Sequence, residues 1–80
     1  MNAPRTLGAL EIWTVYRNPK DYPGQFVVRK FLVTAATRTV MTADMFVAST
    51  LDEIHALLPR GLLRIPRYET DDPVIVEVWL

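Results

Sequence analysis

The sequence predicts an α+β domain: a small, mainly antiparallel four-stranded sheet with one short helix on one face, in the order β-β-β-α-β. Three observations predict this class. Several runs are rich in β-branched and aromatic residues and are separated by turn signals. One short stretch carries helix signals, and residues 1–80 are enough for a single domain only. Residues 1–8 show no periodicity and are expected to form a loose lead-in.

The predicted strands are Leu10–Tyr16, Gln25–Val33, Val40–Ala48 and Val74–Leu80. Between the first two, the segment Arg17–Gly24 ends in a Pro-Gly pair that suits the centre of a type II turn. In the third, Met41 and Met45 lie four residues apart, as on a helix, but the local composition and the alternation of apolar residues favour a strand. Residues 60–72 are expected to be extended or irregular, because they include a proline that disfavours helix.

The helix is predicted from its end signals. Thr50 is a suitable N-cap, and Glu53, three residues later, completes a capping box. Asp52 adds negative charge to the first turn, where the helix dipole favours it. Pro59 and Gly61 end the element. The apolar stripe that must pack on the sheet consists of Leu51, Ile54, Leu57 and Leu58.

The predicted strands are apolar on both faces, whereas one short helix covers only one. The core beneath the helix is expected to comprise Leu10, Ile12, Val28, Leu32, Leu51, Ile54, Leu58, Val76 and Val78. The second face is expected to carry an interface made by Trp13, Arg29, Phe31, Glu77 and Trp79. Tryptophan and arginine are enriched at binding hot spots, and a contiguous exposed apolar patch marks an interface. The alternative is that the long loops fold over these rings within one chain.

Composition narrows the classes of function. Nine basic residues balance nine acidic ones, so no overall field attracts nucleic acid or anionic lipid. Without cysteine, neither disulfides nor thiol chemistry is possible. No apolar run reaches the roughly 18 residues that cross a membrane, and the first residues of the sequence do not form a basic stretch followed by an apolar one. The expected location is therefore the cytoplasm, with no membrane partner.

The candidates for catalysis and metal binding are weak. His55 is the only histidine, and Asp52 lies about one turn before it on the predicted helix. A catalytic unit also needs a nucleophile or a pocket, and Ser49, the only serine, is better placed to help cap the helix. Asp71 and Asp72 match no metal-ligand spacing and are expected to shape a turn. We therefore expect no enzymatic activity, no metal and no cofactor.

Two stretches resemble small proteins predicted from bacterial and phage genomes that have no assigned function. The first runs from Ile12 to Phe26 and includes WTVY and the start of DYPGQFVVR. The second runs from Thr50 to Leu80 and includes TLDEIHALLPRGL and DDPVIVEVWL. The resemblance implies a bacterial or mobile-element source. It implies no activity, ligand or site residue.

The preferred interpretation is a non-enzymatic interaction module, a homodimer or the partner of another protein, that binds through its apolar sheet face or an edge strand. The alternative is a small nucleic-acid-binding accessory protein. Its contacts would come from a basic segment together with the first loop, namely Arg60, Arg64 and Arg67 with Arg17 and Lys20. Electrostatic contacts usually dominate such binding. The neighbouring carboxylates Glu69, Asp71 and Asp72 are expected to neutralise the basic segment, which makes this alternative less favourable.

Overall fold

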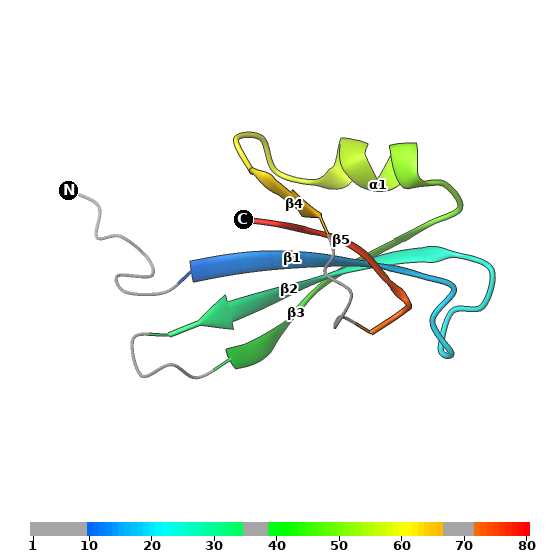
Figure 1. The fold of residues 1–80 in the computed structure, drawn as a ribbon, viewed down its shortest axis with the longest axis horizontal. Coiled ribbons are helices and arrows are strands. Elements are labelled where there is room, and N and C mark those ends of the chain that lie inside the picture. Colours follow the sequence, from blue (N-terminus) through cyan, green and yellow to red (C-terminus); the bar gives the residue numbers. More distant parts are fainter. Residues whose placement is uncertain (1–9, 35–38, 67–71) are drawn as a thin grey trace.

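The computed structural model of the chain describes residues 10–34, 39–66 and 72–80. Within them, five strands form one antiparallel sheet, and one helix packs on one of its faces (Figure 1). The predicted α+β class is confirmed, with five strands in place of four. The predicted lead-in, residues 1–8, lies outside the described residues.

The strands lie in the order β3-β2-β1-β5-β4, with β1 at the centre. The elements are β1 (Leu10–Arg17), β2 (Phe26–Val33), β3 (Thr39–Ala48), α1 (Leu51–Leu57), β4 (Arg64–Pro66) and β5 (Ile75–Trp79). The prediction missed β4, because three residues that include a proline carry little strand signal. Pro66 lies in this edge strand, where the missing N–H breaks no ladder between two neighbours. Ile65 pairs with Val78 of β5.

The loop between β1 and β2 is held by its own polar groups. Asn18 adopts a left-handed backbone conformation with φ 51°, and its Oδ1 accepts a hydrogen bond from the Gly24 N–H at 2.6 Å. Gly24 has φ 76°, a region in which glycine meets no steric cost. The predicted turn is therefore present at Gly24, and it returns the chain directly into β2.

Helix α1 begins with the predicted capping box. The Thr50 side chain accepts from the Glu53 N–H at 3.2 Å, and the Glu53 carboxylate accepts from the Thr50 N–H at 3.2 Å. The same carboxylate accepts from the Ser49 N–H at 3.1 Å. A helix this short is not stable alone in water, so it depends on packing. It buries Ile54 completely against the sheet.

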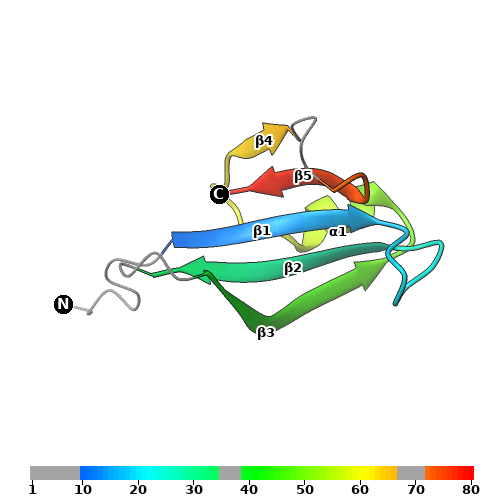
Figure 2. The same cartoon turned by 60° about the horizontal axis from the view of Figure 1, so that its bottom comes forward.

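The core lies between α1 and one face of the sheet. Trp13, Val15, Val28 and Ile54 form its buried centre. The ring of Trp13 is stacked parallel to Phe46 of β3, with 6.0 Å between centroids. In Figure 2 the helix lies behind the sheet, so the face turned to the viewer carries no helix. The partly buried residues packed on the core are Phe26, Phe46, Ala48, Leu51, Leu58, Leu62, Val76 and Trp79.

The predicted core is correct in part. Val28 and Ile54 are buried, and three further predicted residues, Leu51, Leu58 and Val76, pack against the buried centre. The predicted core residues outside this cluster are Leu10, Ile12, Leu32 and Val78. Apolar alternation identified the two faces of each strand. It did not identify which face the helix covers, because both faces of β1 and β5 are apolar.

Candidate functional site on the helix-free face

The helix-free face is assembled from alternate residues of neighbouring strands. In β2, Arg29 and Phe31 point away from the helix, because Val28 between them is part of the core. Phe31 pairs with Ile12 of β1, and Thr14 pairs with Val78 of β5, so these side chains share the same face. Sequence alternation and strand register thus place apolar side chains of three strands side by side.

This face is hollowed over the central strand. The depression has a volume of about 260 Å³ and opens widely to the surface. Its lining comes from four strands and is mainly apolar: Ile12, Thr14, Tyr16, Phe31, Thr39, Ile75 and Val78. Such an apolar concavity is a shape that ligands or protruding side chains fill.

Two large apolar side chains protrude beside this depression. Met41 pairs with Phe31 in the sheet and is 57% exposed. Leu10, at the start of β1, is 49% exposed. Contiguous exposed apolar surface of this kind marks an interaction site. The face therefore combines a hollow with neighbouring projections.

Polar groups on this face are few and balanced. The Arg29 guanidinium forms an ion pair with Asp21 of the β1–β2 loop, with 2.7 Å between Nη2 and Oδ2. Burial raises the pKa of the Tyr16 phenol; Arg29 partly offsets this and Asp72 adds to it. Tyr16 therefore stays neutral near pH 7. The charges of Arg29 and Asp21 cancel, so this pair adds no net charge to the face.

Both edges of the sheet carry features that discourage pairing with another strand. In β3, residues 42–44 lie opposite Lys30 alone, which makes a bulge, and Figure 2 shows β3 bent. The Thr42 hydroxyl donates to the Lys30 carbonyl at 3.0 Å and accepts from the Asp44 N–H at 3.1 Å. The opposite edge, β4, has three residues and includes Pro66. Bulges, short length and proline all protect edges.

The predicted division of faces is correct for β2 and wrong for β1 and β5. Arg29 and Phe31 lie on the helix-free face as expected. Trp13 is 5% exposed in the core, and Glu77 and Trp79 lie on the same helix-covered side. Register explains this, because Trp13 pairs directly with Trp79 and Glu77 pairs with Val15. The two indoles supply core volume beneath a helix too short to fill that space alone.

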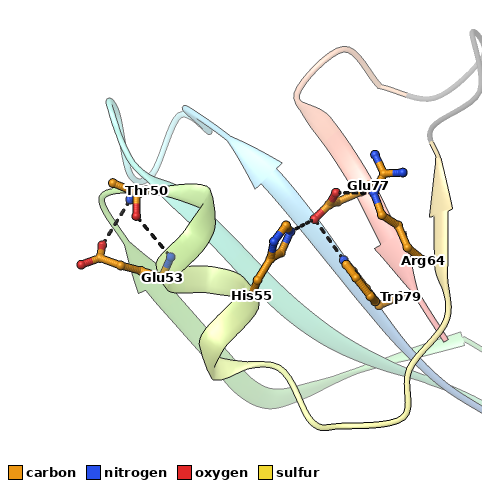
Figure 3. Close-up of polar contacts among 6 residues, drawn as sticks. All are labelled: Thr50, Glu53, His55, Arg64, Glu77 and Trp79. Atoms are coloured by element: carbon orange, nitrogen blue, oxygen red, sulfur yellow. Dashed lines mark hydrogen bonds and ion pairs between the residues drawn. The ribbon is translucent and has the colours of Figure 1, made fainter.

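Glu77 is the centre of a polar cluster beneath the helix (Figure 3). Its side chain is 2% exposed. Its Oε2 accepts from Arg64 Nε at 2.8 Å, and its Oε1 accepts from Trp79 Nε1 at 3.0 Å. Oε1 also contacts His55 Nε2. One carboxylate therefore connects α1, β4 and β5.

Hydrogen bonding decides the charge state of this cluster. Burial alone would raise the pKa of the Glu77 carboxyl, but hydrogen bonds from Arg64, His55 and Trp79 outweigh it and lower that pKa below 4.5. Glu77 is therefore ionised near pH 7. Sequence analysis missed this cluster, since its members are far apart in the chain and only folding brings them together.

The predicted candidates for catalysis are arranged differently from the sequence expectation. His55 contacts Glu77 rather than the Asp52 carboxylate, and its ring packs edge-on against Trp79 with 5.4 Å between centroids. His55 lines neither the hollow over β1 nor the one formed by Arg17, Pro73, Ile75 and Val76. Asp72 shapes a turn as predicted, because its Oδ1 accepts from the Val74 N–H at 3.0 Å. Asp71 lies outside the described residues.

The cations of the predicted nucleic-acid site are not gathered in one place. Arg17 and Lys20 lie at the β1–β2 loop, whereas Arg60 lies in the α1–β4 connection at the opposite end of the sheet (Figure 1). The Arg64 side chain forms an ion pair with Glu77. Arg67 lies outside the described residues. Nucleic-acid binding stays a prediction that this arrangement does not favour.

No protein-family model matches the chain, and no curated protein or solved structure is detectably similar to it. The resemblance to small bacterial and phage proteins therefore stays a prediction. Among residues 10–34, 39–66 and 72–80, no helix is long and apolar enough to cross a membrane. The same residues hold no cluster of three or more His, Asp or Glu side chains that could bind a metal ion.

Proposed function

We propose that the chain is a non-enzymatic interaction module that self-associates, with a second copy packed on the helix-free face of the sheet. The observation that carries this proposal is the apolar hollow over β1, with exposed apolar side chains beside it. A second copy presents the same apolar surface. Burying both together removes apolar area from water, which is the main favourable term in association.

The balance of charge also supports a second copy as the partner. The whole chain has nine cationic and nine anionic residues. On the helix-free face, Arg29 is already neutralised by Asp21. Two identical neutral surfaces approach without repulsion, whereas a strongly charged partner gains little steering from this face.

Face packing is a better route than edge pairing. A strand added to β3 would meet the bulge at residues 42–44, and a strand added to β4 would find only three residues to pair with. These features interrupt the row of backbone groups that strand addition requires. The sheet face offers an apolar hollow whose burial does not depend on backbone pairing.

The test is the molar mass in solution, measured by light scattering over a dilution series. We expect the unmodified chain to approach twice its monomer mass as concentration rises. Phe31→Lys places a charge on the helix-free face and should give a monomer with an unchanged circular dichroism spectrum. Leu57→Lys is the matched control, because Leu57 is 47% exposed on α1, away from this face.

Three outcomes contradict the proposal. An unmodified chain that stays monomeric at high concentration removes self-association. Equal loss of dimer in Phe31→Lys and Leu57→Lys places the interface elsewhere. A Phe31→Lys chain that dimerises as before shows that the helix-free face is not used.

A further inference from the structure

We propose that Met41 is a site of oxidation by hydrogen peroxide, and that the Arg29 guanidinium binds the oxygen of the methionine sulfoxide formed there. The inference concerns one side chain within a single copy of the chain, so it does not depend on the proposed self-association. Two observations carry it: the exposure of Met41 and the position of an Arg29 nitrogen beside its sulfur.

Met41 is the more accessible of the two methionines that the structure describes. It is 57% exposed, whereas Met45, four residues further along β3, is partly buried. The third methionine of the chain, Met1, lies outside the described residues. The sulfur of a methionine must meet the oxidant directly, so an exposed thioether reacts before a sheltered one. Peroxide therefore reaches Met41 before Met45.

The reaction transfers one oxygen atom and two electrons. A lone pair on Met41 Sδ attacks one oxygen of hydrogen peroxide, the O–O bond breaks and an S–O bond forms. The proton on the transferred oxygen passes to the departing oxygen, which leaves as water. The sulfur is oxidised and the peroxide is reduced. An apolar thioether thereby becomes a polar sulfoxide.

Arg29 is placed to donate a hydrogen bond to the new oxygen. Its Nη1 lies 4.0 Å from Met41 Sδ, while its Nη2 donates to Asp21 Oδ2 at 2.7 Å. Because the ion pair uses the other nitrogen, Nη1 can take a new acceptor without breaking it. Thioether sulfur is a weak acceptor. An oxygen added on this side of the sulfur shortens the gap to the ordinary range of an N–H···O bond.

Strand register keeps the two side chains within reach of each other. Met41 pairs with Phe31, which places it diagonally across from Arg29 on the same face of the sheet. The sulfoxide would link β3 to β2 beside the bulge at residues 42–44, where the backbone ladder is interrupted. A charge-assisted hydrogen bond from Arg29 therefore offsets part of the cost of placing a polar group on an apolar surface.

The first arm of the test locates the oxidation. The chain is treated with hydrogen peroxide at a dilution where light scattering shows a monomer, and tandem mass spectrometry follows the gain of one oxygen at each methionine. Met41 should be oxidised several-fold faster than Met45. If Met45 reacts as fast as Met41, the proposed site is wrong. Because the monomer is tested, failure of the proposed self-association leaves this result unchanged.

The second arm tests the role of Arg29 in a Met45→Leu chain, in which Met41 is the one oxidisable methionine among the described residues. Urea unfolding gives the loss of stability on oxidation. Arg29→Leu removes the donor and should increase that loss. Asp21→Asn is the matched control, because it removes the ion pair but keeps the guanidinium, and its loss should equal that of the parent. An equal loss in all three chains overturns the binding of the sulfoxide by Arg29.

A spectroscopic measurement keeps the test decisive if Arg29→Leu does not fold. In the Met45→Leu chain, oxidation should shift the side-chain N–H signals of Arg29 in the nuclear magnetic resonance spectrum. The Arg17 signals are the control, since the Arg17 guanidinium lies over the Phe26 ring, 5.7 Å from its centroid. Arg29 signals that stay unchanged after complete oxidation of Met41 show that the guanidinium does not bind the sulfoxide, and the inference is then wrong.

Discussion

Glu77 shows how one buried side chain connects elements that are distant in sequence. It accepts hydrogen bonds from a strand neighbour, Trp79, and from Arg64 of β4, and it contacts His55 of the helix. Breaking a buried ionic cluster is costly because the remaining charged groups lose their partner. The cluster therefore fixes how α1 and β4 lie against β5.

We expect Glu77→Gln to destabilise the fold by roughly 1.5 to 3 kcal/mol near pH 7, because an amide loses the charge that receives these hydrogen bonds. The loss should shrink as the pH falls. The folded-state pKa of Glu77 is lowered from 4.5, so its stabilisation is complete above that value and is lost as the pH drops through the lowered pKa. Urea unfolding from about pH 7 to about pH 3 measures both effects.

Glu11→Gln is the matched control for this experiment. Glu11 makes a looser pair with Lys30, at 3.7 Å, and its side chain is 37% exposed. Surface pairs contribute roughly 0 to 1 kcal/mol, so this variant should unfold almost as the unmodified chain does. If the two variants lose the same small amount of stability, the Glu77 cluster is not an important part of the fold.

At the scale of the element, α1 depends on its N-terminal cap. We expect Thr50→Ala to lower the free energy of unfolding by about 1 kcal/mol, because the Glu53 N–H loses its acceptor. Ser49→Ala is the control, since Ser49 contributes its backbone N–H rather than a side-chain bond to the cap. Thermal unfolding followed by circular dichroism makes the comparison. Equal stability of the two variants would mean that packing of Ile54 alone holds the helix.

The elements also show how much of the secondary structure could be predicted from the sequence. The helix was predictable because its signals are local: Thr50 and Glu53 satisfy each other across one turn. Four of the five strands, β1, β2, β3 and β5, were predictable from their composition. Strand β4 was not, because only its pairing with β5 makes those three residues a strand.

The candidate site was predictable only in part for a related reason. Strand alternation predicts the correct face for Arg29 and Phe31, whereas Trp13 and Trp79, which it predicts at the interface, pack in the core. Alternation divides a strand into two faces, but the helix selects one of them through three-dimensional packing. Met41, which is exposed on the helix-free face, carried no local signal beyond being apolar.

At the scale of the whole molecule, the described residues leave apolar surface exposed on the helix-free face, around the hollow and at Met41, and a small domain has little stability in reserve. If a second copy covers that face, folding and association are linked, and the melting temperature depends on protein concentration. We expect it to rise by roughly 3 to 6 °C for each tenfold increase in concentration, as shared stabilisation in a domain of this size implies. Differential scanning calorimetry of the unmodified chain and Phe31→Lys measures this slope. Phe31→Lys should melt at one temperature at every concentration, and an unmodified chain that does the same would show that the open face adds nothing to stability.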